Sequence, residues 1–344
     1  MLATLTGSVK NGTALTDAQV VLAVAELIQE EVAADVKAEF LTALALKGET
    51  EAEIAAFARA LRDMSLTPPL DAETRAGEIL DVVGTGGDRL NTFNISTTVA
   101  LLAASAGIRV AKHGNRAVTS KSGSADVLEA LGIRTDLSPV EAAASLKNHH
   151  FAFFFAPAFH PAFRHIAPAR KLCAQRGQRT LFNILGPLLN PARPTAQLTG
   201  VPHPRWCGPL AAVHKALGVR RGMVVCGRVG DAWLDELSTL GENTIAEYRL
   251  ETDVIVSTTV CDPYRVRPAT LADLVGGDAR TNAAIVRDIL TGRERGPKRD
   301  AVLFNAGAAL FVAGRVSSID AGWDLAAELI ESGQAEAKLR ELAG

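Results

Sequence analysis

A glycine-rich segment at residues 80–97, LDVVGTGGDRLNTFNIST, carries the residue types most suited to binding phosphate. A short apolar run ends there in glycines, where backbone N–H groups can approach an anion because no side chain intrudes: Gly84, Gly86 and Gly87. Polar side chains follow, just before an apolar stretch typical of a helix: Asn94, Ser96 and Thr97. Because the free N–H groups of a helix N-terminus attract anions, this order predicts a strand, a phosphate loop and a helix start.

A second segment at 111–126, AKHGNRAVTSKSGSAD, adds positive charge and further hydroxyl groups. Its polar residues are Lys112, His113, Asn115, Arg116, Thr119, Lys121, Ser122 and Ser124. This density of cations and hydroxyls suits a highly anionic ligand such as a diphosphate. One glycine loop alone could be no more than a tight turn between a strand and a helix, but the second segment favours a phosphate site.

Composition bounds the class of protein. A chain of 344 residues with 48% hydrophobic residues predicts a large core, in one large α/β domain or two domains. A net charge of -2 argues against a surface built wholly for nucleic acid. The cysteines have neither disulfide-framework nor zinc spacing, and we expect reduced thiols: Cys173, Cys207, Cys226 and Cys261. The N-terminus lacks a signal-peptide pattern and no apolar run is long enough to span a bilayer, so we expect a soluble, cytoplasmic protein.

Capping signals predict the organisation of the elements that must position these residues. Thr16 with Gln19, and Thr50 with Glu53, have the spacing of capping boxes before stretches of helical periodicity, which predicts a helical domain over residues 1–66. The SLTPP stretch at 65–69 is the predicted boundary. Apolar runs such as IRVAK, FAFFFA and GMVVCG then alternate with helical stretches, one of them opened by Ser138, Pro139 and Glu141. This alternation predicts an α/β domain with a mainly parallel sheet.

The order and spelling of the motifs resemble the anthranilate phosphoribosyltransferase family, nearly from end to end. The matching segments are GTGGD at 84–88, Thr92, the NxST stretch at 94–97, KHGNRAVTSKSGSADVLEALG from 112, FAPAFHPAF from 155, RTLFNILGPLLNPA from 179, LDE at 234–236 and GGDARTNAAI near 276. The resemblance implies transfer of the phosphoribosyl group of 5-phosphoribosyl 1-diphosphate to the amine of anthranilate, a step of tryptophan synthesis. It also implies that a segment near 163–190 returns to the helical domain, that residues 75–162 and 191–344 form the α/β domain, and that the active site lies between them.

The matched motifs carry an implied set of substrate-binding residues. Those for the diphosphate donor are Gly84, Thr85, Gly86, Gly87, Asp88, Thr92, Asn94, Ser96, Thr97, Lys112, His113, Gly114, Asn115, Arg116, Thr119, Ser120 and Ser124. Those for anthranilate are Gly84, Asn115, Arg170, His113 and His160. Arg170 lies ten residues after His160, as in the family pattern, and a bidentate guanidinium would orient the anthranilate carboxylate. The alternatives are a surface role for the arginine and structural roles for the histidines.

Departure of diphosphate leaves charge that must be stabilised, and adjacent carboxylates suit a magnesium ion for that purpose. The resemblance implies Mg²⁺ held by Asp235 and Glu236 in WLDELS, with Ser96 as a further ligand. The alternative for an isolated Asp-Glu pair is an ordinary solvated turn. No general base is expected, because an aromatic amine is already neutral near pH 7.

The sequence departs from the family pattern in two places. The spacing from Arg170 to Arg179 is three residues longer than usual, beside the expected anthranilate pocket, and Arg176 in this insertion is a further candidate for an acceptor contact. The family's DGLDE is here DAWLDE, with Trp233 at or beside the place of the glycine. The loop that carries the acids must therefore bend differently, with possible effects on magnesium affinity.

Competing functions remain open at this point. One is a related phosphoribosyltransferase or a nucleoside phosphorylase with another acceptor, although GTGGD differs from the phosphorylase loop. Another is a non-catalytic paralogue that binds nucleic acid through the basic loop, against which the retained acids and the slightly acidic chain argue. We expect small-molecule substrates, no membrane or nucleic-acid partner, and, from the resemblance, a homodimer formed through the helical domain; an apolar helix face could equally be intramolecular core.

Overall fold

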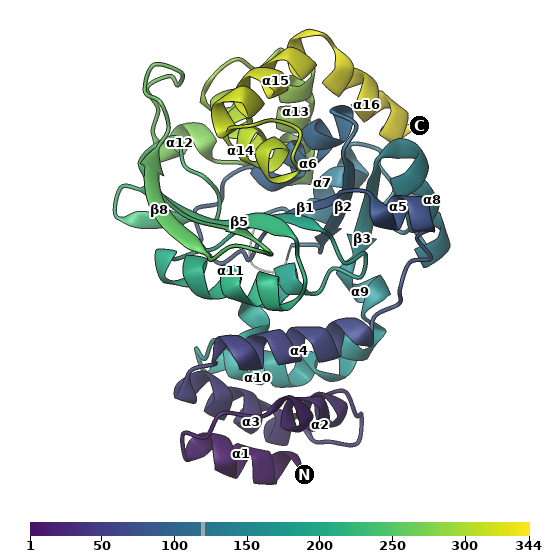
Figure 1. Ribbon diagram of the computed structural model, residues 1–344, viewed down its shortest axis with the longest axis vertical. Coiled ribbons are helices and arrows are strands. Elements are labelled where there is room, and N and C mark those ends of the chain that lie inside the picture. Colours follow the sequence, from purple (N-terminus) through teal and green to yellow (C-terminus); the bar gives the residue numbers. More distant parts are fainter. Residues whose placement is uncertain (118–120) are drawn as a thin grey trace.

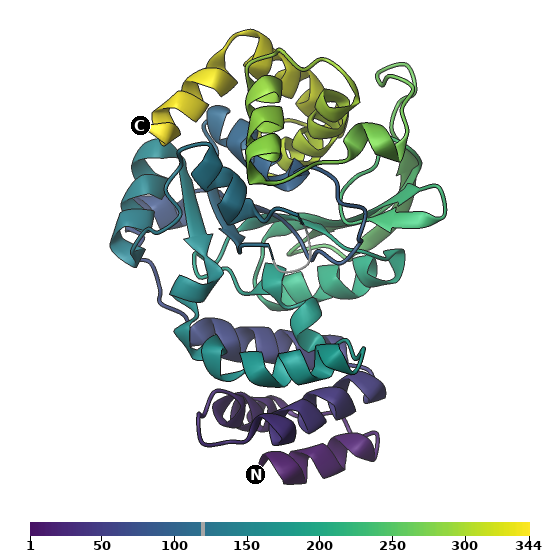
Figure 2. The same cartoon turned by 180° about the vertical axis from the view of Figure 1, so that it is seen from behind.

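The computed structural model describes residues 1–117 and 121–344, and it shows a tier of helices beside a larger unit built around a sheet (Figures 1 and 2). The N-terminal helices are α1 (Leu2–Lys10), α2 (Asp17–Leu27), α3 (Ala34–Lys47) and α4 (Glu51–Asp63). Capping boxes open α2 at Thr16 and α4 at Thr50, as predicted. Helix α10 (Ala167–Gln175), far along the chain, packs against α3 in the same tier (Figure 1).

The larger unit contains an eight-stranded sheet in the order β3-β2-β1-β4-β5-β7-β8, with β6 paired to β5. Its strands are β1 (Ile79–Gly84), β2 (Arg109–Gly114), β3 (Phe151–Phe155), β4 (Ala196–Gly200), β5 (Arg221–Val229), β6 (Ala232–Leu234), β7 (Glu242–Arg249) and β8 (Ile255–Val260). Strands β1 to β5 run parallel, whereas β6, β7 and β8 join by antiparallel pairing. The expected fold class, a small helical domain with a mainly parallel α/β unit, is confirmed.

Helices cover both faces of the sheet. They are α5 (Ala72–Ala76), α6 (Ile95–Ser105), α7 (Ser124–Ala130), α8 (Pro139–His149), α9 (Ala156–Phe159), α11 (Cys207–Ala216), α12 (Leu271–Leu274), α13 (Ala279–Leu290), α14 (Pro297–Val312), α15 (Ile319–Glu331) and α16 (Gln334–Ala343). Short 3-10 turns are η1 (Pro161–His165), η2 (Leu181–Asn183), η3 (Gly186–Leu188) and η4 (Pro204–Trp206). No helix in the described parts of the chain combines the length and hydropathy needed to cross a bilayer.

Alternating residues of β5 show how the two faces are filled. Met223 and Val225 join the core under α6 and α14, whereas Val224 and Cys226 join the core under α11. The second core continues through α11 into α4, α3 and α10, so one apolar cluster joins the sheet to the helical tier. The helical tier is therefore held against the sheet by apolar packing rather than by a linker alone.

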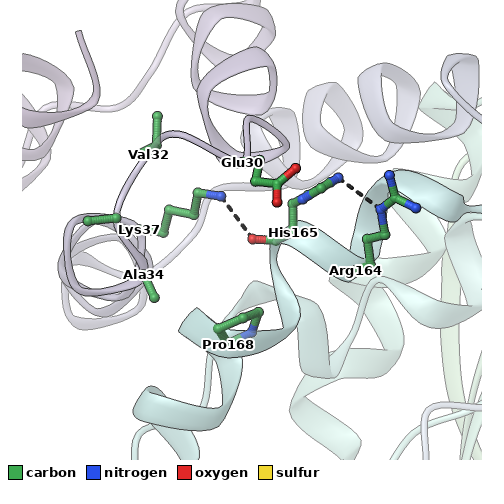
Figure 3. A pocket seen from close by; sticks show the side chains of 8 residues that line it. Glu30, Val32, Ala34, Lys37, Arg164, His165 and Pro168 are labelled. Atoms are coloured by element: carbon green, nitrogen blue, oxygen red, sulfur yellow. Dashed lines mark hydrogen bonds between the residues drawn. The ribbon is translucent and has the colours of Figure 1, made fainter.

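A hollow of about 490 Å³ lies inside the helical tier (Figure 3). The Lys37 ammonium donates there to the carbonyl oxygens of Gln29 at 2.6 Å and His165 at 2.8 Å, and burial lowers the pKa of this lysine. Its lining residues include none of the residues expected to bind substrate. The candidate substrate-binding residues lie instead at the edge of the sheet where the parallel strands end.

Candidate active site

The glycine loop follows the carboxyl end of β1, next to the end of β4. Gly84 pairs with Gly200 in the sheet, and the Thr85 N–H donates to the Gly200 carbonyl at 2.9 Å. Gly86 and Gly87 have φ of 72° and 92°, which side-chain-bearing residues adopt only with strain. The predicted strand, loop and helix start are confirmed, with α6 beginning at Ile95.

The segment that carries the two acids crosses the sheet over glycines. A Cβ atom at Gly84 would lie 2.5 Å from Asp235 Oδ2, and one at Gly227 would lie 2.7 Å from the Glu236 carbonyl oxygen. A Cβ at Gly200 would overlap the Asp235 carbonyl oxygen. Glycines near the ends of β1, β4 and β5 thus let the acid segment lie flat against the sheet.

The crossing brings Asp235 onto the glycine loop and Glu236 onto the start of α6. Asp235 Oδ2 accepts from the Gly86 N–H at 2.6 Å, and Glu236 Oε1 accepts from the Ser96 N–H at 3.1 Å. Burial and the negative charge of neighbouring Asp88 raise the pKa of Asp235 well above its usual range. Burial also raises the pKa of Glu236. The energetic cost of holding these carboxylates together makes the group a strong attractor for a cation.

A buried lysine provides partial compensation for this negative charge. Lys112 is 2% exposed, and its ammonium donates to the Val82 carbonyl at 2.7 Å and to Ser96 Oγ at 3.4 Å. Burial lowers the pKa of Lys112, whereas Asp81 and Glu236 act in the opposite direction. Asp81 is itself fully buried, burial raises its pKa to about 6, and its Oδ2 accepts from Asn190 Nδ2 at 2.9 Å. Asp81 was not among the expected residues, because an acid within an apolar strand gives no motif.

Two buried asparagines fix the chain just beyond the acids. Asn305 accepts from the Leu237 N–H at 2.9 Å and donates to the Leu237 carbonyl at 2.8 Å, in the manner of a strand partner. Asn243 does the same for Ser238, at 2.6 Å and 2.9 Å. Sequence reasoning missed both residues, since each is distant from any chemical motif. Their effect is to hold the acid segment in one conformation.

The second predicted segment lies at the end of β2, beside the first. Asn94 connects the two, because its Nδ2 donates to the Ser122 carbonyl at 3.4 Å while its Oδ1 accepts from Asn282 at 2.8 Å. Ser124 Oγ donates to the Asn115 carbonyl at 3.3 Å, so both residues line the start of α7. Thr119 and Ser120 lie outside the described residues.

Several expected donor-binding residues are directed elsewhere in this structure. The Arg116 guanidinium pairs with Glu129 at 2.7 Å and Asp126 at 3.3 Å, on the surface of α7. The Thr97 hydroxyl is buried on α6, and the backbone of Thr92 forms an isolated antiparallel bridge with Val275, which leaves the direction of its hydroxyl unassigned. Contacts of these side chains with a donor therefore stay predictions.

Three of the expected acceptor residues, His113, His160 and Arg170, lie along a chain of aromatic rings. The rings of His113 and His160 are 5.4 Å apart, and His160 and Phe163 are 5.0 Å apart. Burial lowers the pKa of His113 to about 3 and that of His160 to about 4, so both rings are neutral near pH 7. Arg170 places its guanidinium 5.3 Å from the centre of the Phe182 ring.

The insertion after Arg170 extends towards the helical tier. Arg176 pairs with Asp35 at the start of α3, at 3.5 Å, which makes it a link within that tier rather than the acceptor contact considered for it. Arg179, to which no role was given, reaches the glycine loop instead, and its Nη2 donates to the Gly87 carbonyl at 3.4 Å. The returning segment therefore touches the phosphate loop directly.

The donor set fits a magnesium ion that is completed by its ligand. No group of three or more His, Cys, Asp or Glu side chains that could hold a metal ion occurs in the described parts of the chain. Magnesium commonly uses one or two carboxylates together with water and substrate phosphates. Asp235 and Glu236, with Ser96 beside them, supply that number of hard oxygen ligands next to a phosphate loop.

Comparison with known proteins gives a consistent result. Residues 76–336 match the model of the α/β domain of a glycosyl transferase family, and residues 4–65 match the model of its helical bundle domain. Anthranilate phosphoribosyltransferase of Lacticaseibacillus casei is 49% identical over 306 residues, which is 89% of this chain and 86% of that protein. The corresponding protein of Methanosphaerula palustris is 44% identical over 303 residues, 88% of this chain and 86% of its own.

Solved structures agree with the sequence relatives. The crystal structure of anthranilate phosphoribosyltransferase from Thermus thermophilus is similar with a TM-score of 0.88 and 39% identity, over 98% of both chains. The Saccharomyces cerevisiae enzyme in complex with PRPP and Mg has a TM-score of 0.84 and 27% identity, over 99% of this chain and 97% of that chain. The same yeast enzyme in complex with 4-fluoroanthranilate has a TM-score of 0.84 and 25% identity, over 100% of this chain and 98% of that chain. The resemblance found in the motifs is thereby confirmed, and the chain belongs to the anthranilate phosphoribosyltransferase family of glycosyl transferases.

Proposed function

We propose that this chain transfers the phosphoribosyl group of 5-phosphoribosyl 1-diphosphate to the amine of anthranilate. The carrying observation is the placement of Asp235 against Gly84 and Gly86, which joins an acid pair to a phosphate loop at one strand edge. In the reaction the C1–oxygen bond to diphosphate breaks, a C1–nitrogen bond forms with inversion, and the amine loses one proton. Neither a nucleoside phosphorylase nor a nucleic-acid-binding protein gains support from the comparisons.

The donor side acts by gripping the diphosphate and balancing its charge. We place the diphosphate between the glycine loop and the N-terminus of α6, with the Lys112 ammonium beneath it. The Gly86 and Ser96 N–H groups already hold Asp235 and Glu236 beside this position. Asp235, Glu236 and Ser96 would hold Mg²⁺, which when bound neutralises charge that develops on the leaving diphosphate. The yeast relative's structure with PRPP and Mg supports the use of Mg²⁺ together with this donor.

The acceptor side acts by orienting anthranilate. Arg170 would pair with the carboxylate, and the neutral rings of His113 and His160 would line the pocket with Asn115 and Gly84. Because both histidines are neutral, they place no positive charge beside the aromatic amine. The amine is itself neutral near pH 7 and can attack without a strong base. The yeast relative's structure with 4-fluoroanthranilate supports an acceptor of this chemistry.

The test is the loss of anthranilate fluorescence when the purified protein is mixed with 5-phosphoribosyl 1-diphosphate, anthranilate and Mg²⁺. Metal-dependent loss is the expected result, with diphosphate released in equal amount. A protein that binds the diphosphate donor but leaves anthranilate unchanged would contradict the proposed acceptor. Nucleobases and other aromatic amines, supplied in parallel, would then identify the class that reacts.

We also propose the domain limits expected above, 1–66 with 163–190 and 75–162 with 191–344, supported by the packing of α10 on α3. A homodimer through the helical domain is supported by exposed apolar side chains on α2 and α3: Val21, Leu22, Val36 and Leu46. Light scattering of the wild type and of Leu46→Glu tests it, since a monomeric wild type would contradict the proposal. Four free, buried cysteines support a reducing, cytoplasmic location.

A further inference from the structure

Trp233, the residue that makes the acid loop unlike the family pattern, contacts two side chains, those of Arg228 and His203. It lies on β6 directly opposite Arg228 of β5, whose guanidinium carbon is 4.9 Å from the centre of a Trp233 ring. The His203 ring centre is 5.7 Å from that of Trp233, with the two rings tilted by 51°. His203 follows β4 by three residues, beyond Gly200, over which Asp235 crosses. The stack of Arg228, Trp233 and His203 therefore joins the acid hairpin to the strand that the acids cross.

Asn305 and Asn243 fix the chain after the acids, whereas the side before them is defined by a short hairpin. Strand β6 has three residues, and its connection to β5 is a tight turn with Gly230 at φ 58°. Arg228 also closes this turn, because its Nε donates to the Gly230 carbonyl at 2.8 Å. A slip of one residue in strand pairing turns every side chain to the other face. Such a slip would turn Asp235 away from Gly84 and Gly86.

We propose that Trp233 is a positioning residue for the metal-binding acids, which fixes the register of the β5–β6 hairpin through its contacts with Arg228 and His203. This inference rests on the proposed function, since it assumes that Asp235 and Glu236 bind the metal. Cross-strand pairs and cation–π contacts of this kind favour one pairing register over its alternatives. Trp233 contacts no atom expected to react, so its effect passes through the position of Asp235.

Trp206 offers a matched control. It is a half-buried tryptophan in η4, it also packs at the rim of the core under α11, and Arg205 lies 5.6 Å from its ring centre. It differs from Trp233 in lying outside the acid hairpin. Truncating either ring removes similar apolar contacts, but only truncation of Trp233 should displace the Asp235 and Glu236 carboxylates.

The experiment measures Mn²⁺ binding, in the presence of inorganic diphosphate, by electron paramagnetic resonance for the full-length wild type and its variants. We expect Trp233→Ala to weaken Mn²⁺ binding about tenfold and Trp206→Ala to change it less than about twofold. Trp233→Phe, which keeps a ring against Arg228, should restore binding to within about threefold of the wild type. Steady-state assays should show a raised Mg²⁺ requirement in Trp233→Ala with an unchanged KM for anthranilate.

The outcomes separate this inference from the proposed function. Wild-type Mn²⁺ affinity in folded Trp233→Ala would overturn the positioning role, as would an equal loss in Trp206→Ala. If Trp233→Ala does not fold, His203→Ala removes one half of the stack without changing β6, and undiminished Mn²⁺ affinity in that variant would overturn the role as well. A wild type without metal-dependent loss of anthranilate fluorescence would instead sink the proposed function, whatever the variants bind.

Discussion

The two sides of the candidate site are held together by different kinds of interaction. On the donor side, Asp235, Glu236 and Lys112 are fixed by backbone groups and by charges at hydrogen-bond distance. On the acceptor side, His160, Phe163 and Phe182 meet through ring contacts of 5.0 to 5.9 Å, and Arg170 adds a cation over a ring. The donor side is preorganised by directional bonds, and the acceptor side by shape.

This difference indicates how each side should respond to change. Buried charges and backbone hydrogen bonds tolerate little displacement, because an unpaired partner bears the full desolvation cost. Aromatic packing tolerates conservative replacement when volume is kept. Changes on the donor side should therefore abolish the reaction, whereas changes on the acceptor side should mainly shift the acceptor's KM.

The largest expected effect is loss of the acid pair. Asp235→Asn combined with Glu236→Gln should lower Mg²⁺-dependent turnover by about 1,000-fold or more. The double variant lacks both carboxylate ligands of the metal that neutralises the charge on the leaving diphosphate. The measurement is the initial rate of anthranilate fluorescence loss. Asp253→Asn, an exposed acid beyond β7, is the control and should retain wild-type rates. Full metal-dependent turnover in the double variant would show that the metal is held elsewhere.

The next effect tests the glycine crossing. Gly200→Ala places a Cβ where the Asp235 carbonyl oxygen lies, and we expect a loss of about 3 kcal/mol in the free energy of unfolding together with weaker metal binding. Urea unfolding measures the first quantity. Gly186→Ala is the control, since no atom lies within 4 Å of its added Cβ. Equal stability of the two variants would contradict the close crossing.

A smaller effect is expected on the acceptor side. Arg170→Met should raise the KM for anthranilate about 30-fold and leave the KM for the diphosphate donor within about twofold, because one charge-assisted pair is lost on one substrate only. Lys171→Met, the next residue on α10, is the matched control. A rise in both KM values would mean that the two sides are not separate.

The smallest expected effect is on the pH dependence of stability, and it tests whether the acceptor side is as well buried as the hydrophobic core. Burial lowers the pKa of His160 to about 4, and that of His214, remote from the site beside Tyr248, to about 3. Each histidine therefore contributes stability above its unfolded pKa near 6.5, which is lost as the pH falls towards the folded value. As the pH falls from 7 to 5, we expect the protonation of each histidine in the unfolded state to lower the free energy of unfolding by about 2 kcal/mol.

The variants His160→Gln and His214→Gln isolate these contributions. Each should flatten the pH dependence of urea unfolding by a similar amount, since neither glutamine titrates. An unchanged slope in His160→Gln would mean that this ring is accessible to protons in the native protein. The acceptor side would then be an open surface rather than a packed extension of the core.

Local signals predicted much of the fold. The capping boxes at Thr16, Thr50 and Ser138 each open a helix, because the bonds involved join residues three positions apart. Strand β4 has no continuous apolar run, because polar Gln197 and Thr199 alternate with its apolar residues, although both are buried. Gln197 is satisfied by the Pro187 carbonyl at 2.6 Å, a contact that periodicity does not reveal.

The candidate site shows the same limit. Its glycine loop and acid pair were identifiable from motifs, but their contact joins Gly86 to Asp235 across 149 positions. Arg116 has the residue type of a phosphate ligand, yet Glu129 and Asp126 on α7 engage it. Asn305 has no motif at all, and its importance appears only in its pairing with Leu237. Residue type suggested the chemistry, and long-range packing decided which side chains face it.

The most direct test of the account is a crystal structure with 5-phosphoribosyl 1-diphosphate and Mn²⁺ in place of Mg²⁺. We expect an anomalous peak within coordinating distance of the Asp235 and Glu236 carboxylates, with the diphosphate against the glycine loop at 84–87. A diphosphate bound there without metal at either acid, or a metal bound away from the crossing at Gly200, would contradict the assignment of the donor side.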